Sequence, residues 1–196
     1  MLGFGVRPPE SAVAVRDGVA AIGARHGLDY WDRCDADKRW PEEVWRELAD
    51  GGWLGLAVPE EYGGGQGLLE LAVAAETLAA SGAGAASSFL YLLTPAFGAL
   101  TIARHGTEEQ QRALLPALAA GESETCFAIT EPDAGSNAIN IGTRARRDGD
   151  DFLVTGQKIW ISGVEQARHM VLVSRTIPAA EAKPRLNGFT ILLVDI

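Results

Sequence analysis

Apolar side chains recur three to four positions apart through roughly the first 120 residues, a spacing that predicts amphipathic helices. The pattern covers four segments, residues 11–26, 41–49, 68–80 and 88–105. Ser11 is suited to cap the first of these helices, and Pro41 suits the first turn of the second. A shorter helix is expected after Thr107, because Thr107 and Gln110 have the spacing of a capping box.

Two stretches within this region are predicted to be loops. Residues 29–39 are mostly polar, and residues 58–65 end in three consecutive glycines that no helix tolerates. The most apolar stretch, residues 83–103, contains serine, threonine, tyrosine and proline. It is interpreted as a buried core helix and not as a membrane span.

After Glu124 the pattern changes to short runs that are typical of strands. Residues 144–156 predict two strands around the turn Asp148-Gly149-Asp150, and residues 169–175 and 189–194 predict two more. Helices followed by strands indicate an α+β protein, without the alternation of a dinucleotide-binding fold. We therefore expect a helical domain over residues 1–121 and a β domain over residues 122–196.

Composition narrows the classes of function. A formal net charge of −9 over 196 residues argues against binding to nucleic acid or to an anionic membrane surface. Cys34 and Cys126 lack metal-ligand spacing and are interpreted as free thiols in a reducing compartment, so we expect a cytoplasmic protein. No metal site is predicted, since the acidic residues between positions 32 and 37 lack the glycine and terminal glutamate of a calcium loop.

The candidate chemistry begins at residues 125–137, which read Thr-Cys-Phe-Ala-Ile-Thr-Glu-Pro-Asp-Ala-Gly-Ser-Asn. Phe127 and Ile129 fall on one face of a predicted strand that Pro132 is expected to end, because proline has no N–H to donate. The turn that follows carries backbone N–H groups and hydroxyls. Such a rim suits a polar heteroaromatic ring and a phosphate, although Thr130 and Ser136 are also compatible with an ordinary turn.

A second segment, residues 156–163, reads Gly-Gln-Lys-Ile-Trp-Ile-Ser-Gly and is predicted to place an aromatic and a hydroxyl at the end of a strand. Together the two segments resemble the flavin-binding signatures of the acyl-CoA dehydrogenase family. Pro59-Glu60-Glu61-Tyr62-Gly63-Gly64 and Gly106-Thr107-Glu108-Glu109-Gln110 also resemble patterns of that family. The resemblance implies a helical domain followed by an antiparallel β domain that is incomplete here, since family members are about twice this length.

The same resemblance implies FAD as the cofactor and assigns residues to it. The positions implied to bind the cofactor are Phe127, Ile129, Thr130, Gly135, Ser136, Trp160, Ile161 and Ser162. Trp160 would lie against the flavin ring, and Ser162 would direct its hydroxyl at flavin N5. Without the family pattern, Trp160 is equally compatible with a core tryptophan.

A substrate pocket is implied by the resemblance as well. Ser136 would lie near a bound thioester, and an apolar helical stripe would line the acyl pocket, formed by Leu92, Leu93, Ala96 and Leu100. Periodicity alone assigns that stripe to a protein core, and both interpretations can hold together.

By resemblance, the expected function is FAD-dependent α,β-dehydrogenation of an acyl-CoA or carrier-protein thioester, by a flavoprotein oxidoreductase of fatty acid metabolism. The catalytic base is expected from a C-terminal region that lies outside these 196 residues. Expected partners are the acyl thioester, an electron-transfer flavoprotein or similar acceptor, and further subunits in a homo- or hetero-oligomer, including a second chain that supplies the other half. Two alternatives remain: a flavin oxidase or hydroxylase of the same fold, and a catalytically incomplete scaffold module.

Overall fold

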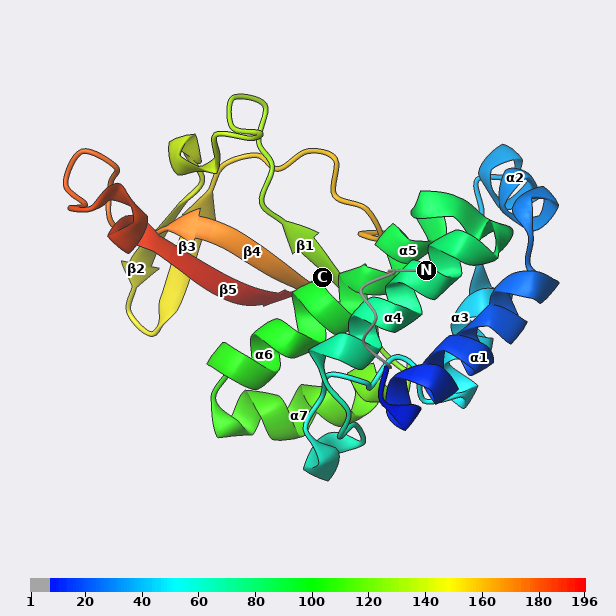
Figure 1. Ribbon diagram of the computed structural model, residues 1–196. Coiled ribbons are helices and arrows are strands. Elements are labelled where there is room, and N and C mark those ends of the chain that lie inside the picture. The colour runs from blue at the N-terminus through cyan, green and yellow to red at the C-terminus, as the bar shows by residue number, and fades with distance from the viewer. Residues whose placement is uncertain (1–7) are drawn as a thin grey trace. The chain divides into compact units, whose positions relative to one another are not determined.

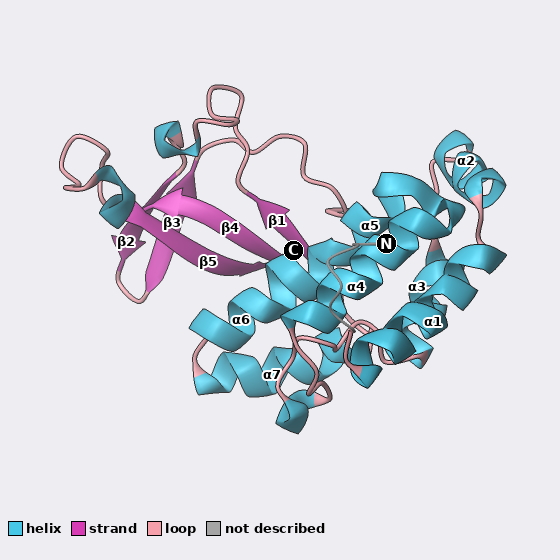
Figure 2. Ribbon diagram, in the orientation of Figure 1, coloured by secondary structure: helices cyan, strands magenta, loops and turns pink. Residues whose placement is uncertain are grey.

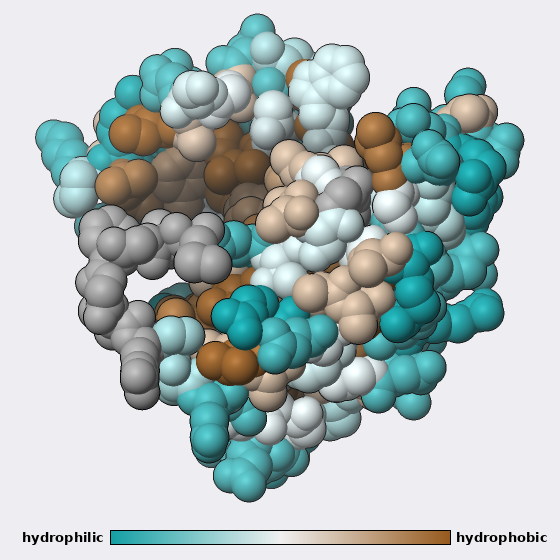
Figure 3. All heavy atoms as spheres, turned by 45° about the vertical axis from the view of Figure 1, so that its right-hand side comes forward, coloured by the Kyte–Doolittle hydropathy of each residue, from teal (hydrophilic) through white to brown (hydrophobic). Residues whose placement is uncertain are grey.

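The computed structural model describes residues 8–196, except for the side chains of residues 82 and 83. Two compact units make up the chain, Met1–Glu124 and Thr125–Ile196 (Figure 1). The first is helical and the second is built on one sheet (Figure 2). Polar side chains cover much of the face seen in Figure 3, with apolar ones between them.

Seven α-helices are described in the first unit: α1 Glu10–Arg25, α2 Leu28–Ala36, α3 Glu42–Asp50, α4 Leu68–Leu78, α5 Gly84–Leu92, α6 Leu100–His105 and α7 Glu108–Ala119. Helix α1 packs along α4, and apolar side chains from α1 to α5 meet in one core. Val19, Leu48, Leu54 and Leu78 lie within that core with at most 2% of their surface exposed. The helical periodicity of the sequence therefore marks the faces that the unit buries.

The cap predicted at Ser11 is wrong, although the helix itself is present. Helix α1 already includes Glu10, and its N-cap is Pro9, which offers no side-chain hydrogen bond. The Ser11 hydroxyl instead donates to Oε1 of Glu70 on α4 at 2.7 Å. A tertiary acceptor on the neighbouring helix thus replaces the local backbone N–H.

The loop predicted over residues 29–39 is also wrong, because Leu28–Ala36 forms helix α2. Tyr30 and Cys34 lie four residues apart and are the buried positions of this helix. The Tyr30 hydroxyl donates to Glu43 on α3 at 2.6 Å, and Arg39 donates to the same carboxylate. A single narrow buried stripe is therefore enough to hold this otherwise polar helix.

Helices α5 and α6 are joined by a π-helical turn, Leu93–Ala99, into one continuous run, and another π-helical turn, Ala79–Ala83, precedes them. By length and composition the run Gly84–His105 could cross a membrane, with a mean hydropathy of 1.5. Within its most apolar 18-residue window, 44% is buried inside the molecule. Core helices of globular proteins pass the same test of length and composition, so the run is weak evidence for a membrane span.

The capping box at the start of α7 is confirmed. The Thr107 side chain accepts from the backbone N–H of Gln110, and the Gln110 side chain accepts from the backbone N–H of Thr107. We expect Thr107→Ala to lower the free energy of unfolding by about 1 kcal/mol, since one helical N–H loses its partner. Thr107→Ser keeps the acceptor and is the matched control. Urea titration followed by circular dichroism measures both, and equal stability of the two variants would contradict the role of the cap.

The second unit holds five strands: β1 Thr125–Ala128, β2 Arg144–Asp148, β3 Asp151–Thr155, β4 His169–Arg175 and β5 Phe189–Asp195. The hydrogen-bonded strands follow the order β1-β4-β2-β3, and β5, which is outside this order, also pairs with β4. The α+β class is confirmed, but the sheet is mixed and not purely antiparallel. Strand β4 runs parallel to β1 and β2, whereas β2–β3 and β4–β5 are antiparallel pairs.

Candidate functional site

The first signature segment leaves the sheet earlier than the sequence predicts. Strand β1 ends at Ala128, so the ladder stops before Pro132 and the proline is not what ends it. Glu131 and Ala134 then exchange two backbone hydrogen bonds, at 3.1 and 3.2 Å, across a tight turn. Gly135 and Ser136 follow on the exposed side of that turn.

The Glu131 carboxylate organises the backbone around this turn. It accepts hydrogen bonds from the backbone N–H of Gly142 at 2.7 Å and of Thr143 at 2.9 Å. Its Oε1 also lies 2.9 Å from Nζ of Lys158, and both charged side chains are only 9% exposed. A buried pair of this kind is stable only when hydrogen bonds satisfy it, and here they do.

Lys158 joins the two signature segments. Its ammonium donates to the carbonyl of Ile129 at 2.9 Å as well as to Glu131. Next to it, the backbone N–H of Ile159 donates to the carbonyl of Thr130 at 3.0 Å. Segments 129–131 and 158–159 therefore lie side by side, although 27 residues separate the ion pair in sequence. We call this set of contacts the Glu131–Lys158 clamp.

The clamp also fixes the charge state of Glu131. Burial raises the pKa of its carboxyl, but hydrogen bonds from Thr143, Lys158 and the Gly142 backbone outweigh burial and lower the pKa to about 2. Burial lowers the pKa of Lys158, and Glu131 opposes that effect. Both groups face each other as a charged pair at neutral pH.

Trp160 stands out in the second segment. Its side chain is 85% exposed, and its φ of 59° places it in the left-handed region, which is rare for a bulky residue. The strand predicted around it is wrong, because β3 ends at Thr155 and residues 156–163 are irregular. Ile161 is half-buried and Ser162 is exposed, just before Gly163 with φ 73°.

Arg175 is a second buried cation, and it binds the backbone of the segment that follows the turn. Arg175 is 3% exposed, and its guanidinium lies 4.0 Å from the centre of the Phe189 ring. It donates to the carbonyl of Ile141 at 2.8 Å and to that of Ile139. Neither this residue nor the clamp was found from the sequence. The signal in the sequence that points to the clamp is one ionisable residue in each signature segment, Glu131 in the first and Lys158 in the second.

The predicted cofactor residues are thus gathered in one unit. Phe127 and Ile129 pack against the small apolar cluster around Ala134, Ile141 and Val173. Thr130 is half-buried at the clamp, while Gly135, Ser136, Trp160 and Ser162 face solvent. The clamp holds the two segments together. Their backbone groups, their hydroxyls and the indole of Trp160 therefore belong to one region of the Thr125–Ile196 unit.

The predicted substrate stripe lies in the helical unit instead. Leu92 and Ala96 pack against the helical core, Leu93 is 5% exposed and Leu100 is half-buried. The core interpretation of this stripe holds for Leu92, Leu93 and Ala96, and a substrate contact by any of the four stays a prediction.

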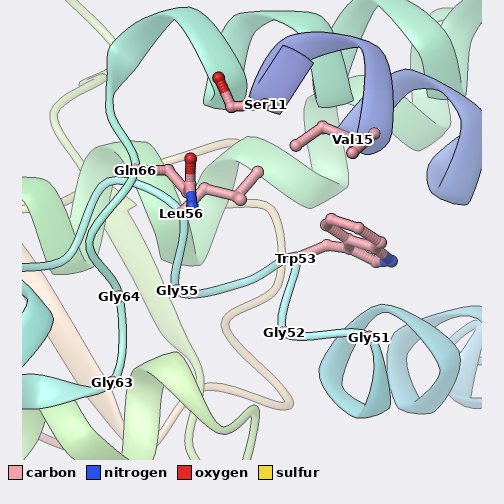
Figure 4. Close-up of a pocket in the computed structure, with 11 residues that line it drawn as sticks. Ser11, Val15, Gly51, Gly52, Trp53, Gly55, Leu56, Gly63, Gly64 and Gln66 are labelled. Atoms are coloured by element: carbon pink, nitrogen blue, oxygen red, sulfur yellow. The ribbon is translucent and has the colours of Figure 1, made fainter.

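A cavity of about 240 Å³ in the helical unit lies between α1 and two glycine-containing segments, residues 51–56 and 63–66 (Figure 4). Ser11, Val15, Trp53, Leu56 and Gln66 line it together with several glycines. It contains none of the predicted site residues. Among the described residues, no group of three histidine, cysteine, aspartate or glutamate side chains could hold a metal ion.

Comparison with known families identifies the family of this chain. A model of the acyl-CoA dehydrogenase N-terminal domain matches residues 9–122, and a model of the acyl-CoA dehydrogenase middle domain matches residues 126–196. The chain belongs to the acyl-CoA dehydrogenase family. The structural match agrees, since helices followed by a sheet are found in solved members of this family.

Three relatives illustrate the match. The acyl-CoA dehydrogenase FadE12 of Mycobacterium tuberculosis is 41% identical over 183 residues, which cover 93% of this chain and 46% of FadE12. A glutaryl-CoA dehydrogenase of Mycobacterium smegmatis, solved in complex with FADH2, superposes with a TM-score of 0.82 at 28% identity over 96% of this chain and 46% of that one. A chain of the ChsE4–ChsE5 complex of M. tuberculosis superposes with a TM-score of 0.75 at 28% identity, over 98% of this chain and 48% of that one. The chain spans about half the length of the relatives it matches.

Proposed function

We propose that this acyl-CoA dehydrogenase family chain is the N-terminal, flavin-facing part of an enzyme that dehydrogenates an acyl thioester. The observation that carries the proposal is Trp160, an indole that is 85% exposed on a backbone with φ 59°. A large apolar side chain gains nothing from exposure, and the left-handed backbone costs energy. Both features are expected of a residue that contacts a planar ligand.

The residues around Trp160 fit FAD. An exposed ring face, the hydroxyls of Ser136 and Ser162, and the Thr130 side chain lie on segments joined by the clamp. These are the groups that would hold a flavin and a phosphate. When bound, FAD would supply the acceptor for the hydride that leaves the β-carbon of the substrate.

Under this proposal the chain would position the cofactor and the substrate, and it would not supply the base that removes the α-proton. Trp160 would lie against the flavin ring, Ser162 would donate a hydrogen bond to it, and Ser136 would lie near the thioester. The Glu131–Lys158 clamp keeps these groups in register, which matters because proton and hydride must leave in an aligned geometry. A base that removes the α-proton would come from the remainder of the full-length enzyme, and electrons would then pass to an electron-transfer flavoprotein or similar acceptor.

The purified protein also distinguishes the proposed activity from two other functions of the same fold. A flavin oxidase or hydroxylase would also bind FAD, but its reduced form would react rapidly with oxygen. A scaffold module would bind no flavin at all. Flavin absorbance of the purified protein therefore separates the scaffold from both enzymes, and the rate of reoxidation in air separates the enzymes from each other.

The decisive experiment compares this chain with a chimera in which the C-terminal portion of FadE12 follows Ile196. We expect weak FAD binding by the chain alone and at least about tenfold tighter binding by the chimera, or about 1.4 kcal/mol, because the added portion would supply the groups that hold the far phosphate and the adenine. The chimera should also lose its flavin absorbance on mixing with an acyl-CoA. A chimera that folds by circular dichroism yet binds no FAD would refute the proposal.

Ser162 gives a residue-level prediction for the completed enzyme. Removing a donor that acts in a water-excluded site typically costs on the order of 10²–10³ in rate. Backbone N–H groups of the same segment can share this role, so we expect Ser162→Ala to slow flavin reduction by about 10- to 100-fold, with little change in substrate affinity. Ser162→Thr retains the donor and should stay near the parent rate. Rapid-mixing absorbance measures both, and an unchanged rate for Ser162→Ala would show that the residue serves only the turn.

A further inference from the structure

Arg175, the last residue of β4, is buried to a degree that is unusual for arginine. Only 3% of its surface is exposed, and among the described residues no carboxylate forms an ion pair with it. The hydrogen bonds of its guanidinium go instead to three backbone carbonyls, those of Ile139, Ile141 and Arg185. Arginine is rarely buried without a paired carboxylate, so this residue is expected to do something that an apolar side chain would not.

Two of these carbonyls lie just beyond the first signature segment. Ile139 is three residues after Ser136, and its carbonyl is bound by Nη2 of the guanidinium. On the other side of Ser136, Ala134 is 2% exposed and exchanges two backbone hydrogen bonds with Glu131. Residues 135–138, which we call the Ser136 loop, therefore run between two fixed points. Four residues can span no more than about 14 Å, so the anchors determine where the Ser136 hydroxyl lies.

The Arg175 side chain holds only one side of the candidate site. Its three acceptors all lie outside the second signature segment. The segment that carries Trp160 is held by the clamp instead, through the donors of Lys158. The indole and the Ser136 hydroxyl thus depend on two different buried cations.

We propose that Arg175 is a positioning residue that holds the Ser136 loop in place to bind the phosphate of a flavin cofactor. The inference rests on the proposed function and adds the residue that prepares its phosphate site. The Ser136 hydroxyl and the backbone N–H groups of this exposed loop are donors of the kind that a phosphate requires. Because the guanidinium uses Nε, Nη1 and Nη2 on three different carbonyls, the single ammonium of lysine cannot replace it.

Comparison of FMN, which carries one phosphate, with riboflavin, which has none, measures what the phosphate contributes. Neither ligand has an adenine, so the 196-residue chain itself can be used. Quenching of flavin fluorescence gives both dissociation constants. We expect the parent to bind FMN at least about tenfold more tightly than riboflavin, because the phosphate accepts charge-assisted hydrogen bonds.

Arg175→Met and Arg175→Lys should each lower this FMN preference to less than about threefold, while riboflavin affinity stays within about twofold of the parent. Riboflavin binding would depend on Trp160 and the clamp, which neither substitution alters. Leu172→Ala is the control for stability, since Leu172 is 7% exposed and lies three positions from Arg175, on the opposite face of β4. It should lower the free energy of unfolding and leave the FMN preference unchanged.

A double variant shows whether Arg175 acts through Ser136. Ser136→Ala should lower the FMN preference by itself. Adding Arg175→Met to it should lower the preference by no more than about twofold further, because both changes remove the same contact. Losses that multiply would contradict a role through Ser136.

The outcomes separate this inference from the proposed function. A parent chain that binds neither flavin would overturn both, whereas a parent that binds FMN and riboflavin equally would overturn only the role of Arg175. The same holds if Arg175→Met keeps the FMN preference, or if it weakens both flavins alike, as a lost fold would. An Arg175→Lys variant that keeps the preference would show that charge is sufficient without position, and a Leu172→Ala variant that loses it would show that stability alone sets the preference. Either result would also overturn the proposal.

Discussion

Exchange of Lys158 for methionine is expected to lower the free energy of unfolding of the Thr125–Ile196 unit by about 3 kcal/mol. The substitution replaces the apolar stem of the side chain with one of similar length but leaves the Glu131 carboxylate, 9% exposed, without its cation. The carbonyl of Ile129 loses a donor as well. Two backbone N–H groups still bind Glu131, which is why the low end of the usual range for a broken buried pair applies.

Urea titration followed by circular dichroism measures this loss, with Arg168→Met as the control. Arg168 is exposed and close to β4, so the loss of its charge should change stability by less than about 0.5 kcal/mol. The double variant Glu131→Gln with Lys158→Met should recover part of the loss, because no unpaired charge then stays buried. A Lys158→Met variant as stable as Arg168→Met would contradict the role of the clamp.

The clamp also predicts how stability changes with pH. The pKa of Glu131 is lowered to about 2 from an ordinary value near 4.5. The unfolded chain therefore binds this proton more readily, so the stabilisation is present above about pH 4.5 and is lost as pH falls toward 2. Lys158→Met should make this acid-side loss smaller, because the carboxylate no longer has its cation. A parent and a variant with the same acid dependence would show that Lys158 does not hold the charge of Glu131.

The elements that the sequence predicts well are those with local causes. The capping box at Thr107 and Gln110 and the turn Asp148-Gly149-Asp150 each depend on residues within four positions, and both form as predicted. Helix α2 was missed because its buried stripe, Tyr30 and Cys34, is stabilised by Glu43 on another helix. Local composition around such a helix is indistinguishable from that of a polar loop.

The same distinction explains the site. Signature segments were found because their residue types occur in a fixed order, but the contacts that join them could not be read from spacing. Lys158 bonds across 27 residues to Glu131 and across 29 to the Ile129 carbonyl, and β1 pairs parallel with β4 over a still longer excursion. Hydrophobic alternation predicts that a strand exists, but it does not identify the partner or direction. The backbone of Trp160 was equally beyond prediction, since tryptophan has no preference for a positive φ.

Trp160 combines exposure with backbone strain, and this combination predicts a substitution that separates stability from binding. Trp160→Gly removes the left-handed strain of about 1–2 kcal/mol. It also adds flexibility to the unfolded chain, which costs about 0.4–1 kcal/mol. An indole that is 85% exposed contributes little packing, so we expect the free energy of unfolding to change by less than about 1 kcal/mol.

FAD binding should respond very differently to the same substitution. Stacking of a ring on an aromatic side chain contributes about 1–3 kcal/mol, so Trp160→Gly should weaken FAD binding by roughly 5- to 150-fold. Trp160→Phe keeps an aromatic face and should retain most of the affinity, although its backbone stays in the strained region. Flavin fluorescence anisotropy measures both dissociation constants, and urea titration measures stability in parallel. Equal FAD affinity of the parent and Trp160→Gly would remove the main support for a flavin site here, because the exposed indole would then have no ligand to explain its position.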